Sequence, residues 1–141
     1  MTLLEAWINS GYSETEPFAF TDTNGASCQG TFADVQRLFS EANLWYNGAP
    51  ACITCHNSNL AAAAAQMDLS SYAGIIAGSR RASADVKGND ILGSGVWEQS
   101  KLYEVLTLPN ENQQAMPLGR PPDAFPPGGP VILAGEQVAN P

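Results

Sequence analysis

The chain has 141 residues, a net charge of −8 and 44% apolar residues. This length predicts one domain with a sizeable core, and the apolar content argues against disorder over most of the chain. Fourteen acidic residues against six basic ones argue against binding to nucleic acid or to an anionic membrane, because both attract Lys and Arg. No stretch approaches the roughly 18 apolar residues of a spanning helix. The single histidine excludes a histidine-rich metal centre.

The first predicted elements are two short helices separated by a loop. One helix ends near Gly11 and carries four apolar residues on one face: Leu3, Leu4, Trp7 and Ile8. Residues 12–30 are rich in Ser, Thr, Asn and Gly and predict a loop. Thr31 then opens a second helix with its own apolar side: Phe32, Val35, Leu38 and Phe39.

The second half of the chain predicts further short helices and a long irregular segment. Helices are expected at 71–77 and 100–106, each with a serine near its start, and a polar loop at 78–95 between them. Residues 109–130 are rich in proline and have little periodicity, so an ordered loop is expected there. The predicted fold class is all-α, with long ordered loops between short helices.

One motif points to a cofactor, around which these loops would wrap: Cys52-Ile53-Thr54-Cys55-His56. Cys-x-x-Cys-His is the attachment signature of c-type haem. Two thiols one turn apart can each form a thioether to one vinyl group of the porphyrin. The next residue, His56, is then carried under the iron as its proximal ligand.

Three other interpretations of the motif are weaker. A thioredoxin-like Cys-x-x-Cys follows a strand in a βαβ unit, and no such strand precedes Ala51. A Cys₃His zinc site would recruit Cys28, Cys52, Cys55 and His56. Adjacent residues such as Cys55 and His56 rarely converge on one tetrahedral ion, however. The third interpretation is a surface pair of cysteines without a function.

The distal iron ligand cannot be a second histidine of this chain. Candidates are Met1, Met67, Met116, a lysine or no ligand at all. Met116 is preferred because it lies in a proline-stiffened loop, so little extra ordering entropy is lost when its thioether meets the iron. Met67 better fits the role of a gap-filling core methionine.

These motifs resemble the monohaem c-type cytochrome domains of exported bacterial proteins, in the broad class I group. The matching segments are residues 31–39, 52–56, 69–75, 100–106 and 116–119, the last being Met-Pro-Leu-Gly. The resemblance implies a small class I-like cytochrome c fold that binds one covalently attached haem c. It implies a six-coordinate iron that carries one electron. Cys52 and Cys55 would attach the haem, and His56 and Met116 would ligate its iron.

On this resemblance, residues 1–141 form a single cytochrome c domain. Its parts would be a terminal-type helix at 1–11, a haem-binding core at 31–108 and a distal methionine loop at 109–130. The family's final apolar helix has no counterpart after Pro130, whereas residues 3–11 look like it. Circular permutation, a slice from a tandem array and exchange between molecules remain open explanations, beside an unrelated helix. A displaced helix predicts that Trp7 packs near Phe32, Val35 or Phe39.

Several residues between the two iron ligands are candidate pocket walls, and core packing suits each of them equally: Leu69, Tyr72, Trp97, Leu102 and Tyr103. Arg80, Arg81 and Arg120 could pair with haem propionates or lie in solvent. Cys28 is left over after haem attachment and is expected in an exposed loop. It could form a disulfide with a partner, or be a buried, inert thiol.

The leading functional hypothesis is an electron carrier, or the electron-transfer module of a larger complex, rather than an enzyme. The alternative is a haem enzyme or gas sensor with an open sixth site, or a haem-bearing module of an oligomeric assembly. We expect a redox partner protein with a basic docking surface, and self-association through the terminal helix or Cys28. A periplasmic or extracytoplasmic location is expected, with the signal peptide absent from this chain.

Overall fold

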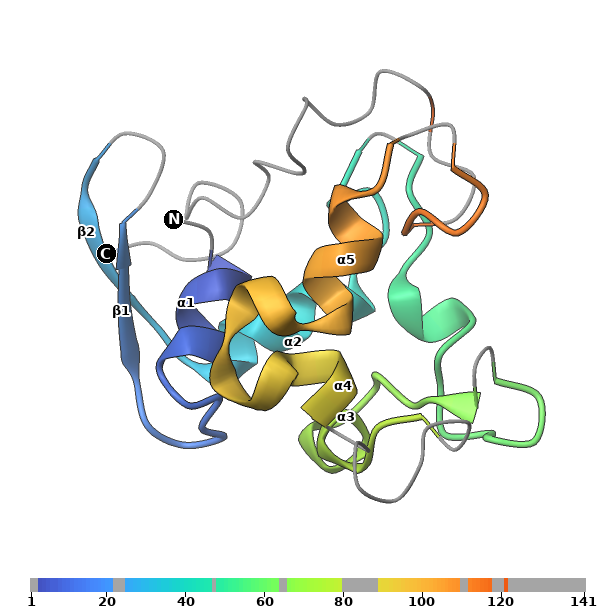
Figure 1. Ribbon diagram of the computed structural model, residues 1–141, viewed down its shortest axis with the longest axis horizontal. Helices are drawn as coiled ribbons and strands as arrows, with labels where there is room; N and C mark the ends of the chain where they lie inside the picture. The colour runs from blue at the N-terminus through green and yellow to red at the C-terminus, as the bar shows by residue number, and fades with distance from the viewer. Residues whose placement is uncertain are drawn as a thin grey trace.

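A computed structural model describes residues 3–21, 25–46, 48–63, 66–79, 89–109, 112–117 and 121 (Figure 1). Short helices account for most of its regular structure, and one small sheet lies at one end of the molecule. The α-helices are α1 (Leu3–Asn9), α2 (Phe32–Ser40), α3 (Tyr72–Ala77), α4 (Asn89–Leu92) and α5 (Lys101–Thr107). The strands are β1 (Phe18–Thr21) and β2 (Ser27–Gly30), and the 3₁₀ turns are η1 (Cys52–Thr54), η3 (Gly93–Gly95) and η4 (Trp97–Gln99).

The all-α prediction is wrong, because β1 and β2 form a two-stranded antiparallel sheet inside the predicted loop at 12–30. The fold is mixed α/β. Phe18 pairs with Gly30 and Phe20 with Cys28, and these four residues are the buried ones of their strands. Alternation of buried and exposed residues is the signal of a strand. It extends over only four residues in each strand and lies among polar neighbours, so the sequence pattern hid it.

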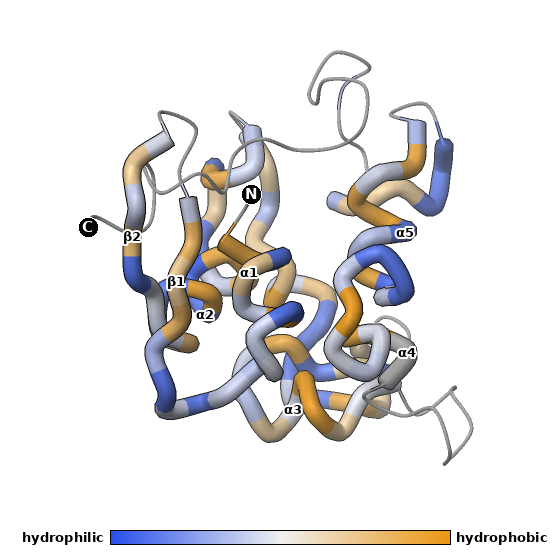
Figure 2. Tube along the Cα trace, turned by 60° about the vertical axis from the view of Figure 1, so that its left-hand side comes forward, coloured by the Kyte–Doolittle hydropathy of each residue, from blue (hydrophilic) through white to orange (hydrophobic). Residues whose placement is uncertain are grey.

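The core forms where α1 meets α2 and the sheet. Trp7 has no exposed surface, and its ring centroid lies 5.4 Å from that of Phe32 on α2. The predicted packing of Trp7 on this helix is therefore confirmed. Phe32 also contacts the edge of Tyr72 on α3, with ring centroids 5.2 Å apart. Figure 2 shows α1 beside β1, with hydrophobic stretches in both elements.

Three helices begin at residues whose side chains or neighbours accept free backbone N–H groups at the helix start. The carboxylate of Asp34 accepts a hydrogen bond from the N–H of Thr31 at 2.8 Å, at the start of α2. The hydroxyls of Ser71 and Ser100 accept backbone N–H groups at the starts of α3 and α5. These three helices follow the predicted segments closely. The predicted loop at 78–95, by contrast, includes the short helix α4, so that expectation is wrong in part.

Among the described residues, no helix has both the length and the apolar character needed to cross a membrane. This finding agrees with the expectation drawn from the sequence.

Candidate functional site

The Cys-x-x-Cys-His segment forms one tight turn at the end of the molecule away from the sheet (Figure 1). The carbonyl of Cys52 accepts the N–H of Cys55 at 3.2 Å and that of His56 at 2.9 Å. A single turn of backbone therefore carries both thiols and the imidazole. This local arrangement is the one that the spacing of the motif predicts.

The two thiols of this turn differ in their surroundings. Cys52 packs against the core, and its Sγ donates to the carbonyl of Leu38 on α2 over 3.8 Å. Burial raises the pKa of the Cys52 thiol to about 11. Cys55 is exposed. One sulfur thus anchors the turn to the protein, and the other faces the surface.

His56 is buried, with 9% of its surface exposed, and its backbone is held from two sides. Its N–H donates to Cys52, as described above, and its carbonyl accepts the N–H of Leu69 at 3.0 Å. The carbonyl of Leu69 in turn accepts the side-chain amide of Gln36 on α2 at 3.2 Å. The predicted proximal ligand therefore stands on a backbone tied to a helix elsewhere in the sequence.

Trp45 belongs to this site, although the sequence analysis did not single it out. Its indole N–H donates to the carbonyl of Leu38 at 2.8 Å, and this is the same oxygen that the Cys52 thiol contacts. The side chain of Trp45 is buried. Nothing in the sequence pattern marks this role, because it depends on the tertiary approach of the segment to the last turn of α2.

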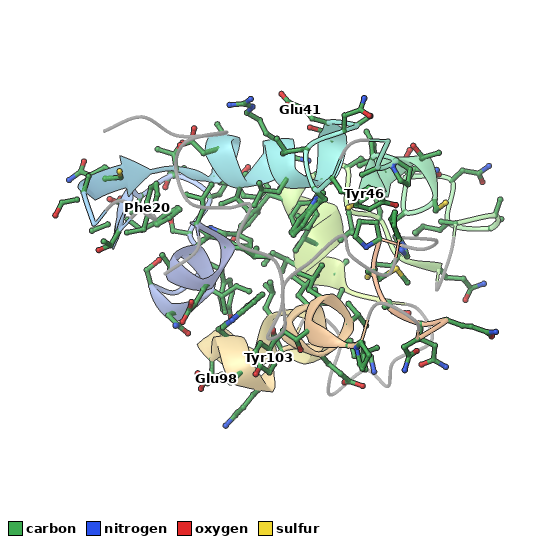
Figure 3. The ribbon with its side chains drawn as sticks, turned by 90° about the horizontal axis from the view of Figure 1, so that it is seen from above. Phe20, Glu41, Tyr46, Glu98 and Tyr103 are labelled. Carbon is green, nitrogen blue, oxygen red and sulfur yellow. The ribbon has the colours of Figure 1, made fainter. Side chains whose placement is uncertain are left out.

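Met116 lies in the segment 112–117 and is half-buried against the core. Its N–H donates to the carbonyl of Val105 at 3.0 Å, which ties the segment to α5. Ala115, beside it, is buried. Figures 1 and 3 both place this segment and the turn at Cys52–His56 at the end of the molecule away from β1 and β2. Met67 also packs against the core, as expected of a gap-filling residue.

Of the residues predicted to line a haem pocket, Leu69 contacts the candidate site and Tyr72 packs elsewhere in the core. Leu69 is buried and bonds to His56, as described above. Trp97 and Tyr103 pack edge to face with ring centroids 5.5 Å apart, next to the buried Leu102 of α5. Tyr72 instead joins the core around α1, where its hydroxyl donates to the carbonyl of Tyr12 at 3.0 Å. Arg80, Arg81 and Arg120 lie outside the described residues.

A zinc site built from the cysteines is not formed. No group of three or more His, Cys, Asp or Glu side chains that could hold a metal ion occurs within the described parts of the chain. Cys28 lies on β2 with 3% of its surface exposed, so its expected place in an exposed loop is wrong. No disulfide joins any of the three cysteines.

The donor set fits a covalently attached haem better than a bare metal ion. It comprises two thiols on one turn, a buried imidazole that follows them directly, and a half-buried thioether on a segment tied to α5. No protein-family model matches the chain, and no curated protein matches it in sequence. Assignment of a function therefore depends on these residues alone.

Proposed function

We propose that this chain is a one-electron carrier with a single haem c, acting outside the cytoplasm either alone or as a module of a larger complex. The observation that carries the proposal is the turn of Cys52, Cys55 and His56, with the imidazole buried and both thiols outside any disulfide. Attachment of haem c outside the cytoplasm is implied by the resemblance to exported bacterial cytochromes.

Each residue of the turn has a distinct role in this proposal. Cys52 and Cys55 would each add S–H across one vinyl group, forming a C–S bond while the hydrogen goes to the neighbouring vinyl carbon. His56 and Met116 would hold the haem iron through their imidazole and thioether groups. When bound, the haem supplies a redox couple that gains and loses one electron, and a thioether ligand favours the ferrous form. Because two residues of the chain would hold the iron, no place on the iron would remain for a substrate, which favours a carrier over an enzyme.

The proposed partner is another redox protein that approaches the side of the turn where Cys55 is exposed. Cys52 packs toward α2, so its thioether would be the more enclosed of the two. Electron exchange is expected through the more exposed edge.

The first test is export of the chain in a bacterium with a c-type maturation system, followed by visible spectroscopy of the purified protein. We expect haem that survives denaturation and solvent extraction, and a low-spin spectrum with the weak far-red band of thioether ligation in the ferric form. Cys52→Ala and Cys55→Ala should each leave one thioether, and His56→Ala should abolish stable incorporation. Cys28→Ala is the matched control and should attach haem normally.

Two results would count against the proposal. Absence of covalent haem from the exported wild-type chain would exclude a c-type cytochrome. A high-spin spectrum that shifts on addition of carbon monoxide or cyanide would show an open site, and would favour a haem enzyme or a gas sensor instead.

A further inference from the structure

Helix α2 contacts the turn that carries Cys52. Its start is capped by Asp34, as described above, and its apolar face is buried against α1 and the sheet. Figure 3 shows α2 extending from the sheet toward the segments that carry the candidate ligands. The helix therefore offers a fixed reference against which a ligand can be held.

One connection from α2 to His56 passes through a polar side chain, Gln36. Gln36 is half-buried, and its Nε2 donates to the carbonyl of Leu69 at 3.2 Å. The N–H of Leu69 donates to the carbonyl of His56 at 3.0 Å. This second bond joins the two ends of the loop that runs from His56 to Leu69. Gln36 bonds to the Leu69 end of the same loop. Both backbone polar groups of Leu69 are thus used, one toward the helix and one toward the histidine.

The backbone of His56 makes another hydrogen bond, within its own turn, and this bond cannot replace the one from Gln36 to Leu69. The bond from the His56 N–H to the Cys52 carbonyl lies within the turn itself, so it fixes the imidazole relative to the two thiols. It does not fix the turn relative to the helix. The contact of the Cys52 thiol with Leu38 ties the near side of the turn to α2. The Gln36–Leu69 bond ties the chain to the same helix on the far side of the histidine.

We infer that Gln36 is a positioning residue for His56, acting through Leu69 to set how the proximal imidazole meets the haem iron. This inference rests on the proposed function. The amide suits the role because its N–H₂ group donates to a carbonyl without bringing a charge into a half-buried site. Gln36→Leu keeps a comparable volume and removes the donor. Gln36→Glu keeps the shape and replaces the donor with a carboxylate oxygen.

The experiment compares holoproteins by two measurements. Both variants lose the bond from Gln36 to the Leu69 carbonyl, which should make local opening of this segment easier. Exchange of the Leu69 amide hydrogen should then be about two- to tenfold faster. The ferric haem methyl proton shifts, which report the orientation of the axial imidazole, should move as well. Gln36→Lys retains N–H donors but adds a charge, so it should slow exchange of the Leu69 amide relative to Gln36→Leu and restore the methyl shifts in part. Gln29→Leu and Gln29→Glu make the same changes at an exposed site on β2 and should alter neither.

The outcomes separate the inference from the proposed function. Faster exchange at Leu69 with unchanged methyl shifts would mean that Gln36 anchors the loop without orienting the ligand, which overturns the inference. Unchanged exchange in both variants would overturn it too, with the carrier function intact. If Gln36→Leu fails to fold, Gln36→Glu and Gln36→Lys supply the same comparison. A wild-type chain without haem would overturn the proposed function and the inference together.

Discussion

At the level of single residues, the two proposed iron ligands are held in different ways. His56 has both its backbone N–H and its carbonyl in hydrogen bonds and is buried. Met116 is half-buried, and its segment is tied to α5 by the bond from its N–H to Val105. A ligand that is less buried is lost from the iron more easily. Mutations should therefore weaken ligation by Met116 before they weaken ligation by His56.

Replacement of Met116 by Ala tests the distal ligand directly. We expect loss of the far-red band and a fall in reduction potential, because a thioether stabilises the ferrous state relative to a weaker or oxygen ligand. Redox titration followed by visible spectroscopy measures both. Met67→Ala is the matched control and should leave the band in place, at a cost in stability. If the Met67 variant lost the band and the Met116 variant kept it, the assignment of the distal ligand would be reversed.

The two thiols of the turn should differ in reactivity before haem is attached. Cys55 is exposed, whereas Cys52 packs on the core with its pKa raised to about 11 by burial. At pH 8 only about one Cys52 in a thousand is then thiolate, the reactive form. The fraction rises as pH approaches that pKa. Iodoacetamide labelling of the haem-free chain, followed by peptide mass analysis, should modify Cys55 well before Cys52.

The buried Cys28 provides the control for this labelling. It should react slowly under native conditions and fully in denaturant. Equal rates at Cys52 and Cys55, with Cys28 still protected, would show that the turn does not form until haem is bound.

At the level of elements, α1 contributes more to the core than its seven residues suggest. Five of them are buried, and Trp7 both packs against Phe32 and donates its indole N–H to the carbonyl of Ser13 at 3.0 Å. A helix this short has little stability of its own. Its helical structure therefore depends on tertiary packing against α2 and β1.

Trp7→Ala should lower the free energy of unfolding by about 3–5 kcal/mol, since it removes a fully buried aromatic side chain and leaves a cavity. Chemical denaturation followed by circular dichroism measures the change. Ile8→Val, a smaller change at a neighbouring buried position, should cost about 0.5–1.5 kcal/mol. A loss below 1 kcal/mol for Trp7→Ala would mean that α1 contributes little to the fold.

At the level of the whole molecule, charge and candidate site are separated along the chain. The net charge is −8, yet residues 42–67, which include the entire turn, contain no Asp, Glu, Lys or Arg. Thr54, Cys55 and Asn59 are exposed and uncharged. The expectation of a basic partner considers only the net charge. The local composition instead favours weak electrostatic steering at the turn. At 0.1 M salt, charges more than about 10 Å away are largely screened.

Electron exchange with small anionic and cationic reagents should therefore depend only weakly on ionic strength, despite the acidic chain. Stopped-flow rate constants at low and high salt measure this dependence. Asn59→Lys should make the rate with an anionic reagent fall as salt rises, because it places a positive charge near the exchange site. Thr15→Lys, an exposed position before β1, should have a much smaller effect. A steep fall with the cationic reagent in wild type would favour a basic partner.

Features that depend on short spacing could be predicted before the structure was known. Those are the turn of Cys52, Cys55 and His56, the helix beginning after the Thr31 cap, and the serine-capped starts of α3 and α5. Each depends on residues within one turn of one another, so local chemistry specifies it. The packing of Trp7 on Phe32 was also predictable. In a domain this small, the apolar faces of two helices have few surfaces other than each other to pack against.

The remaining features depend on contacts between segments far apart in the sequence. The strands β1 and β2 carry too short an alternation to be recognised alone, and their pairing depends on burial of Phe18 and Phe20 beneath neighbouring elements. Cys28 was expected at the surface because its flanking residues are polar, yet strand pairing turns it inward. The bonds of Gln36 and Trp45 join positions that no sequence period relates. Long-range contacts of this kind form because the chain folds back on itself, and local propensity does not encode them.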